Sequence, residues 1–277
     1  MGSIDVEPER ILIDLAQTIS YEVVPSVGGA LCVIVVKMMA QVVHDEKHRK
    51  PTTIWVVRHA EREDNVNKAW RRWFYAITHL AKDDSPLSKR GRLQAEECAA
   101  RFANVHLDHV FSSPYNRCIE TAVRIVRSRG MSIKVEPGLS EVLFLCENPA
   151  GFQDVTLLKE TYAEIDTNYL PIYSRDELDY AYERYRSDWV CLPRIRHTID
   201  RIINKYSGSL LIVSHGAVIG AIHEVLIGKW RAVGQATVSK FIDIGSKQFV
   251  NIGVRQFVCE YTGDTSHLSD LANLRAY

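Results

Sequence analysis

Short continuous runs of apolar residues alternate along the chain with longer stretches in which apolar residues recur every three or four positions. The runs at 54–57 and 209–213 end in polar residues, which is typical of parallel strands buried on both faces. Briefer strand-like runs are found at 110–111 and 133–135. The stretches with helical spacing are 87–102, 118–126 and 217–227. This alternation predicts an α/β fold, a three-layer sandwich in which helices cover both faces of a mostly parallel central sheet.

Polar side chains directly follow three of the predicted strands. In an α/β sheet covered on both faces, ligands bind beyond the carboxyl ends of the strands, so residues at these positions bear on function. The segments are 58–62 after the first strand, 112–117 after the second and 214–216 after the last. We therefore expect arginine and histidine side chains from all three segments to meet at one edge of the sheet.

Residues 1–50 precede this pattern, and we predict that they form an N-terminal extension to a domain at 51–277. The charged run at 44–50 is typical of a solvated linker. The apolar stretch at 23–43 is interrupted by polar residues and a proline, which leaves fewer than the ~20 residues that span a bilayer. We expect it to pack against the main domain, with a membrane anchor as the less favoured alternative. The opening residues lack the pattern of a secretory signal.

Composition excludes some classes of function. Lys plus Arg and Asp plus Glu both number 34, so the chain has no global basic field that would attract nucleic acid or an anionic membrane. The six cysteines are scattered and show no paired spacing of a zinc site or a redox motif. We therefore expect no metal, cofactor or nucleic acid, and we predict a reducing, cytoplasmic location. Any anion site must be local.

The residues that follow the strands suit phosphoryl transfer, which needs a nucleophile in line with the leaving group and positive donors around the phosphate oxygens. His59 is the candidate nucleophile, because a neutral imidazole attacks phosphorus well once its other nitrogen is held by a hydrogen bond. Arg58 and Arg117 offer planar forks for phosphate, and Arg62 and His215 complete the set. A single Arg-His pair after a strand is more often a surface loop. Three such segments at one sheet edge favour a catalytic site.

These motifs together resemble the histidine phosphatase superfamily, which is also called phosphoglycerate-mutase-like. They are VRHAER at 57–62, Leu87-Ser88 with Gly91 and Gln94-Ala95, SSP at 112–114 with Arg117 and Thr121-Ala122, and VSHG at 213–216. The match covers about residues 53–228, and Ala60 stands where the family usually has glycine. Within the superfamily, the segments 135–141 and 165–171 resemble the phosphatase domain of the ubiquitin-associated and SH3-domain-containing proteins and ecdysteroid-phosphate phosphatase.

The resemblance implies a role for each site residue. Arg58, Arg62, Arg117 and His215 are expected to bind phosphate, His59 to be phosphorylated and Glu141 to donate the proton. From the residues alone, Glu61, Glu63 and Asp64 are rivals of Glu141 for that last role. The chain has Gly216 where the histidine acid phosphatases place an aspartate after their second histidine, which disfavours that branch.

The sequence favours hydrolysis but leaves two other functions open. A phosphoglycerate-type mutase needs extra basic residues over its substrate, and only Arg71-Arg72 suggests itself. A weakly active phosphate-binding adapter in signalling is the other alternative, although neither His59 nor Arg117 is missing. The expected partner is a phosphorylated protein or small molecule, with a homodimer left open.

A segment at about 146–185 is rich in tyrosine and acidic residues, and we expect it to be an insertion that caps the site. Tyr162, Tyr169 and Tyr173 would either stack on an aromatic or steroid substrate or serve as packing residues, and packing is favoured. Phosphotyrosine proteins, aryl phosphates and steroid phosphates therefore remain as substrate classes.

Overall fold

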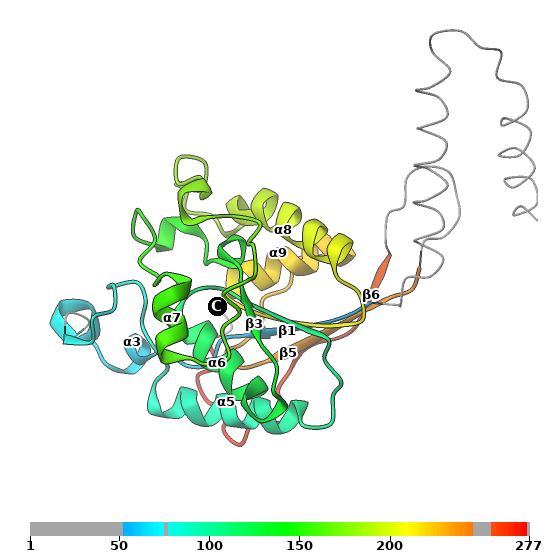
Figure 1. The fold of residues 1–277 in the computed structure, drawn as a ribbon, viewed down its shortest axis with the longest axis horizontal. Helices are drawn as coiled ribbons and strands as arrows, with labels where there is room; N and C mark the ends of the chain where they lie inside the picture. The colour runs from blue at the N-terminus through cyan, green and yellow to red at the C-terminus, as the bar shows by residue number, and fades with distance from the viewer. Residues whose placement is uncertain (1–51, 75–76, 246–255, 276–277) are drawn as a thin grey trace, which may run out of the picture. The chain divides into compact units, whose positions relative to one another are not determined.

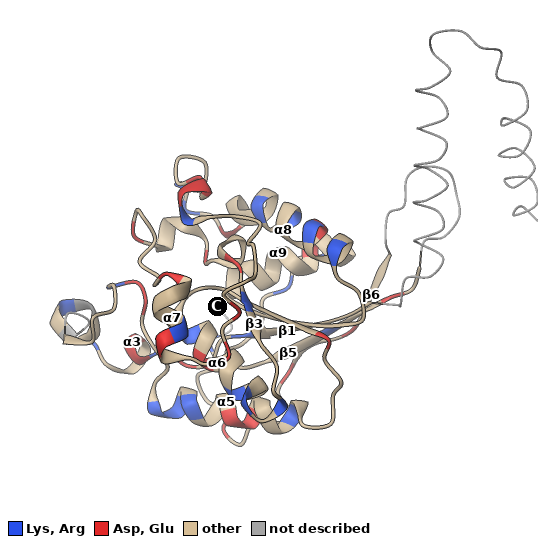
Figure 2. Ribbon diagram, in the orientation of Figure 1, with Lys and Arg blue, Asp and Glu red and all other residues tan. Residues whose placement is uncertain are grey.

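The computed structural model describes residues 52–74, 77–245 and 256–275 (Figure 1). The predicted extension at 1–50, with its apolar stretch at 23–43, lies outside the described residues. Among the described residues, no helix combines the length and the apolar character needed to cross a bilayer. Lys and Arg side chains share α5 and α8 with acidic ones (Figure 2), in keeping with the balanced composition.

A six-stranded sheet forms the centre of the described part of the chain. Its strands are β1 (Thr53–Arg58), β2 (His109–Ser112), β3 (Ile133–Val135), β4 (Ser209–Ser214), β5 (Val238–Asp243) and β6 (Phe257–Asp264), in the order β3-β2-β4-β1-β5-β6. The first four strands pair in parallel, while β5 runs antiparallel to β1 and β6 antiparallel to β5. The predicted mostly parallel sheet is thus confirmed, and the two antiparallel strands extend one side of it.

Two pairs of long helices cover the sheet and make three layers (Figure 1). The pair α5 (Lys89–Phe102) and α6 (Asn116–Val126) packs on one face, and the pair α8 (Leu192–Lys205) and α9 (Gly216–Ile227) on the other. Two shorter helices are α3 (Glu63–Val66) and α7 (Val155–Thr161). Single turns of other helix types are found at Trp70–Phe74, Arg127–Arg129, Pro137–Leu139, Leu143–Leu145, Arg175–Glu177 and Asp188–Cys191.

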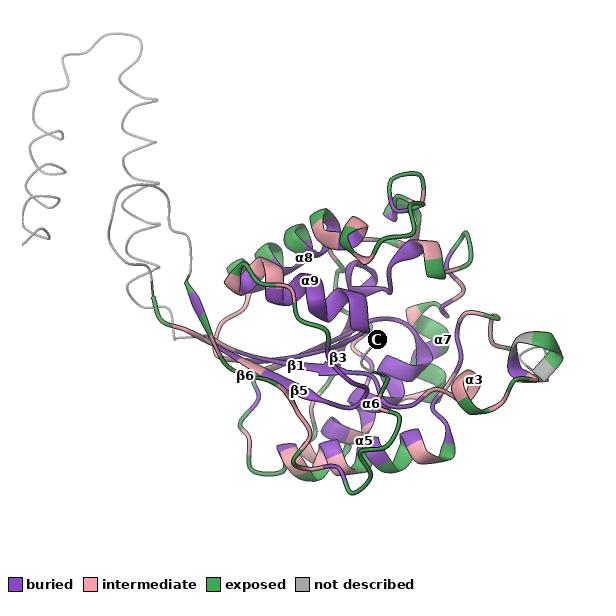
Figure 3. Cartoon of the chain, turned by 180° about the vertical axis from the view of Figure 1, so that it is seen from behind, coloured by how far each residue is buried: buried purple, intermediate pink, exposed green. Residues whose placement is uncertain are grey.

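The core lies on both faces of the sheet because successive side chains of a strand point in opposite directions. In β1, Trp55 and Val57 pack against α5 and α6, whereas Ile54 and Val56 pack against α8 and α9. All four are buried, which explains why the strand reads as an unbroken apolar run. Figure 3 shows the buried strands and α9 between half-exposed outer helices.

The predicted helices are confirmed with small shifts at their starts. The helix expected from residue 87 begins at Lys89, because the Ser88 side chain caps it by accepting a hydrogen bond from the Gly91 N–H. A side chain at Gly91 would clash, since its Cβ would lie 2.0 Å from the carbonyl oxygen of Glu61. This close approach ties the start of α5 to the segment that follows β1. The helix α8 and the strands β5 and β6 were not predicted.

Candidate active site

The register of the parallel strands brings the three polar segments to one edge of the sheet. Arg58 pairs with Ser214 across β1 and β4, and Ser112 pairs with Val213 across β2 and β4. The ladder continues one residue further, because the His59 N–H donates to the Ser214 carbonyl at 2.9 Å. Backbone pairing between the strands therefore fixes the positions of the Cα atoms of the residues that directly follow them.

His59 is held as a neutral imidazole whose Nδ1 is hydrogen-bonded and whose Nε2 has no hydrogen-bond partner among the described residues. Its side chain is buried, and Nδ1 lies 2.8 Å from the carbonyl oxygen of Ala60. Because a carbonyl only accepts, Nδ1 carries the proton and Nε2 keeps its lone pair. Burial holds the pKa of His59 well below its usual range, and the nearby charges of Arg117, Arg58 and Arg62 lower it further. The imidazole is thus neutral at neutral pH.

His215 lies beside His59, with the two ring centroids 5.3 Å apart. Its Nε2 is 2.7 Å from the Ser113 hydroxyl oxygen, and its Nδ1 is 3.7 Å from Oε2 of Glu141. Burial lowers the pKa of His215 well below the usual value, followed by the charge of Arg117. His215 therefore lies close to both His59 and Glu141.

A cavity of about 250 Å³ opens next to these residues. It is lined by Arg62, Lys82, Asp83, Arg117, Glu141, Phe144, Leu145, Cys146 and Glu147. Three of the predicted site residues thus contribute to its wall. His59 and His215 are almost completely buried and do not line the cavity, but one ring nitrogen of each and the cavity-lining Glu141 carboxylate lie within 4.8 Å of one another.

The Arg117 guanidinium is held in place by the protein but keeps an N–H group that is available to a ligand. Nη1 donates to the Asp83 carbonyl at 3.0 Å, and the guanidinium carbon lies 4.4 Å from the centroid of the Tyr115 ring. Its buried Nε has no hydrogen-bond partner among the described residues. A buried, cavity-lining guanidinium with a spare donor suits an anionic ligand.

The other two arginines are more strongly engaged by the protein. Arg62 forms a two-pronged contact with the Asp64 carboxylate, in which Nε lies 2.7 Å from Oδ1 and Nη2 contacts Oδ2. Arg58 donates from Nη1 to the carbonyl oxygens of Val233 at 2.6 Å and Arg275 at 2.7 Å. Arg58 does not line the cavity, but its charge acts on His59.

Glu141 differs from its predicted rivals in its surroundings. It lines the cavity, and Oε1 accepts a hydrogen bond from the Val142 N–H at 3.1 Å. Of the rivals, Glu61 accepts instead from Ser88 and Arg90, Glu63 accepts from the Asn67 side chain, and Asp64 binds Arg62. None of the three lines the cavity. The structure therefore leaves Glu141 as the carboxyl group that faces both the cavity and His215.

Two helices begin at this edge and add positive potential. Helix α9 starts at Gly216, directly after His215, and α6 starts at Asn116. The amino end of a helix carries a partial positive charge that favours a bound anion. Together with the guanidinium groups, the helix ends give this edge of the sheet a positive potential that favours an anion.

The sequence comparison decides the family. A profile of the histidine phosphatase superfamily (branch 1) matches residues 54–239. The chain belongs to this superfamily. The match includes β1 and β4 with the polar segments that follow them, so the predicted resemblance is confirmed.

Relatives within the histidine phosphatase superfamily include proteins of different named activities. Over 214 residues the chain is 26% identical to ecdysteroid-phosphate phosphatase of Drosophila melanogaster, covering 66% of this chain and 28% of that protein. It is 28% identical to human ubiquitin-associated and SH3 domain-containing protein A, again over 214 residues, covering 64% and 31% of the two chains. The chain thus spans less than a third of the length of these relatives.

A solved structure confirms the phosphoglycerate-mutase-like fold. The phosphoglycerate mutase of Bacillus anthracis superposes with a TM-score of 0.52 and 20% identity, covering 80% of this chain and 97% of that one. At this level of identity the likeness concerns the fold alone.

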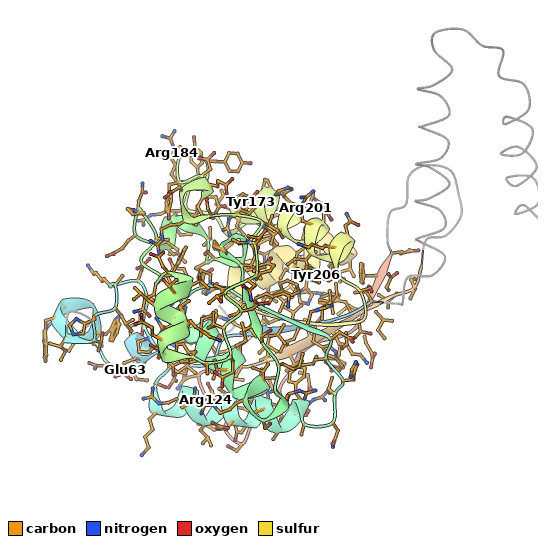
Figure 4. The ribbon with its side chains drawn as sticks, in the orientation of Figure 1. Glu63, Arg124, Tyr173, Arg184, Arg201 and Tyr206 are labelled. Atoms are coloured by element: carbon orange, nitrogen blue, oxygen red, sulfur yellow. The ribbon has the colours of Figure 1, made fainter. Side chains whose placement is uncertain are left out.

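The three tyrosines at 162, 169 and 173 do not line the cavity beside His59 and His215, and Tyr169 instead lines a second cavity of about 540 Å³. Their hydroxyl groups contact Asn116, Glu136 and His197, respectively (Figure 4 labels Tyr173). Of the possible mutase clamp Arg71-Arg72, the Arg72 side chain is exposed and does not line the cavity beside the histidines. The side chain of Arg71 lies outside the described residues.

Sequence reasoning missed several contributors to the site. Asp83 holds Arg117 through its backbone carbonyl, and Asp84 accepts hydrogen bonds from the Asn116 backbone and side chain at 2.7 and 2.6 Å. Burial raises the pKa of Asp84 to about 7. Ser113, part of the SSP motif, contacts Nε2 of His215 through its hydroxyl group. The adjacent acidic residues Asp83 and Asp84, just before the Leu87-Ser88 motif, are the sequence signal that could have pointed to these two contributors.

Proposed function

We propose that the chain is a metal-independent phosphomonoester hydrolase that acts through a phosphohistidine intermediate on His59. The observation that carries this proposal is the free Nε2 of a buried, neutral His59 at the edge of a cavity lined by Arg62 and Arg117. Arg58, Arg62, Arg117 and His215 bind the phosphoryl oxygens in this proposal, and Glu141 transfers protons.

In the first step, the lone pair on Nε2 of His59 forms a bond to phosphorus while the bond from phosphorus to the leaving oxygen breaks. The leaving oxygen takes a proton from the Glu141 carboxyl group. In the second step, the Glu141 carboxylate accepts a proton from water, whose oxygen bonds to phosphorus as the bond to Nε2 breaks. Phosphate leaves, and both residues return to their starting states.

The charge around the site supports catalysis by arginine rather than by a metal. Among the described residues, ligand atoms of His59, Glu141 and His215 lie within 4.8 Å of one another, a spacing that suits a metal ion. The same histidines are subject to the positive charges of Arg58, Arg62 and Arg117. That field opposes a divalent cation and favours an anion.

The cavity wall supports a substrate with an apolar group next to the phosphate. Phe144 and Leu145 contribute apolar side chains, and Cys146 and Glu147 come from the predicted insertion at 146–185. We propose that this insertion is part of a domain at 51–277 and selects the leaving group. Phosphotyrosine, aryl and steroid phosphates are the substrate classes, and a relative named for an ecdysteroid phosphate fits this range.

The test is hydrolysis of p-nitrophenyl phosphate by purified protein in excess chelator. We expect turnover, together with an acid-labile, base-stable phosphoenzyme after acid-free quenching of a ³²P-labelled substrate. An absolute need for added metal would overturn the mechanism. Conversion of 3-phosphoglycerate to 2-phosphoglycerate faster than its hydrolysis would indicate a mutase, and phosphate-ester binding without turnover would indicate an adapter.

A further inference from the structure

The segment that carries Glu141 is held by two buried residues that are distant in sequence. Arg194 lies on α8, and Glu183 precedes that helix. Nε and Nη2 of Arg194 donate to the two carboxylate oxygens of Glu183 at 2.6 and 2.9 Å. The two side chains are 6% and 3% exposed, so this is an ion pair inside the protein.

The remaining donors of Arg194 all bind backbone next to the candidate proton donor. Nη1 donates to the carbonyl oxygens of Gly138 and Ser140 at 2.8 and 2.9 Å, and Nη2 donates to that of Glu141 at 3.2 Å. A guanidinium has five N–H groups, and here five contacts use them. The rigid fork therefore fixes three carbonyl groups of one short segment relative to α8.

Glu183 binds the same segment on the C-terminal side of Glu141. Its Oε2 accepts a hydrogen bond from the Leu143 N–H at 3.1 Å, in addition to the one from Arg194. The Glu141 side chain is in turn tied to its own backbone through the Val142 N–H. The direction of the carboxyl group thus depends on backbone that the ion pair holds from both sides.

Close packing leaves this segment little room to move independently. A Cβ at Gly138 would lie 2.4 Å from Oγ1 of Thr198 on α8, and the Ser214 hydroxyl donates to the Leu139 carbonyl at 2.8 Å. The segment is therefore pressed between α8 and the end of β4, with Arg194 at the contact.

We propose that Arg194 and Glu183 are positioning residues that hold Glu141 in place for proton transfer. The inference rests on the proposed function, because it assigns a task to the Glu141 carboxyl group. Proton transfer requires the donor and acceptor atoms to come within hydrogen-bond distance, and a misplacement of about 1 Å can reduce the rate by about 100-fold. Neither residue touches the substrate cavity.

The experiment compares two substrates in the variants Arg194→Lys and Glu183→Gln. p-Nitrophenyl phosphate has a leaving group that departs readily without a proton, whereas phosphoserine requires protonation of an alkoxide. The ratio of the two kcat/KM values isolates the first chemical step, since kcat/KM does not include hydrolysis of the phosphoenzyme. We expect kcat/KM for phosphoserine to fall by about 10- to 100-fold and that for p-nitrophenyl phosphate by about 3-fold or less.

A combined variant tests whether the effect passes through Glu141. In a Glu141→Gln background, adding Arg194→Lys should leave the ratio between the substrates unchanged, because the group being positioned no longer donates. A further drop in that ratio would overturn the proposal. Equal losses on both substrates in the single variants would also overturn it and would assign the pair a purely structural role.

Arg129→Lys is the matched control. Arg129 also uses its guanidinium to hold backbone carbonyls, those of Phe102 and Val105, but none of these residues lines the cavity. We expect both kcat/KM values to stay within about 2-fold of wild type. Thermal unfolding identifies a variant that fails to fold, and Arg194→Lys, which keeps a positive charge beside Glu183, carries the test if Glu183→Gln does not fold. Failure of the proposed function itself is distinguishable, because wild type would then form no phosphoenzyme.

Discussion

The two sides of the candidate site are built in different ways. The floor, formed by residues just after β1, β2 and β4, is placed by backbone hydrogen bonds between neighbouring parallel strands. The opposite side, the segment 138–143 with Glu141, has no such ladder and is placed by the side chains of Arg194 and Glu183. His59, the proposed nucleophile, is therefore positioned by backbone pairing between strands, whereas Glu141, the proposed proton donor, is positioned mainly by side chains, above all the Arg194–Glu183 ion pair.

This difference indicates which parts of the site tolerate side-chain substitutions and which do not. A ladder of backbone bonds survives most side-chain substitutions, because each bond is independent of the residue type. A buried ion pair does not, because removal of one partner leaves a buried charge at a cost of about 3–5 kcal/mol. Substitutions in the floor should thus affect chemistry with little loss of structure, and those in the opposite side should affect both.

The largest effect is expected at the nucleophile in the floor. His59→Ala removes the atom that bonds to phosphorus, so kcat should fall by at least about 10⁴-fold and the labelled phosphoenzyme should disappear. Rapid-quench labelling and steady-state kinetics measure both. His106→Ala is the control, because the His106 side chain is 81% exposed. A phosphoenzyme of wild-type abundance in the His59 variant would place the nucleophile elsewhere.

Loss of a phosphate-binding group in the floor ranks second. Arg117→Ala should lower kcat/KM by about 100- to 1,000-fold, because a preorganised charge at the transition state is lost, and it should weaken inhibition by inorganic phosphate. Arg124→Ala, two turns along on α6, is the matched control (Figure 4). Arg124 pairs with Glu96 and Glu120, and we expect a change of about 2-fold or less. Equal losses in the two variants would remove Arg117 from the site.

The proton donor on the opposite side should show a smaller and selective effect. Glu141→Gln keeps the shape but cannot donate a proton, so kcat/KM for phosphoserine should fall by about 100-fold while that for p-nitrophenyl phosphate falls much less. The measurement is kcat/KM for a series of aryl phosphates whose phenol leaving groups differ in pKa. We expect log(kcat/KM) to fall more steeply with leaving-group pKa in the variant than in the wild type. If the slope is unchanged, another group donates the proton.

The smallest expected effect is on how the free energy of unfolding depends on pH through His59 in the floor. The pKa of His59 is well below its model-compound value of 6.5 in the folded state, so below about pH 6.5 the unfolded chain binds a proton that the folded chain does not. Falling pH then lowers the free energy of unfolding by up to about 1.4 kcal/mol per pH unit for this residue. His59→Ala lacks this contribution and should gain stability relative to wild type as the pH falls from 7 to 5. Urea unfolding at several pH values measures the difference, and a constant difference would contradict a depressed pKa.

The floor was predictable from the sequence because its signal is local. A continuous apolar run buried on both faces predicts a parallel strand, and the residues just beyond it, His59 and His215 among them, must lie at its carboxyl end. The helices at 87–102 and 217–227 were found from their spacing for the same reason. These inferences need only neighbouring residues.

The opposite side was not predictable by that route. Nothing near Glu183 or Arg194 in the sequence indicates that their side chains meet, or that both contact the backbone of 138–143. The edge strand β6 was not predicted because most of its residues alternate between partly and largely exposed positions, which gives no continuous apolar run. In α8, the buried residues lie on one side of a largely polar helix, and the three-to-four-residue spacing of its isoleucines is the signal that predicts it.

The hydrogen bond between Nδ1 of His59 and the Ala60 carbonyl also determines the chemical identity of the proposed intermediate. Phosphohistidine exists as two isomers, substituted on one or the other ring nitrogen. Because Nδ1 is engaged with the backbone, the phosphoryl group is expected on Nε2 alone. An antibody selective for that isomer would therefore detect the phosphorylated chain, and one selective for the other isomer would not.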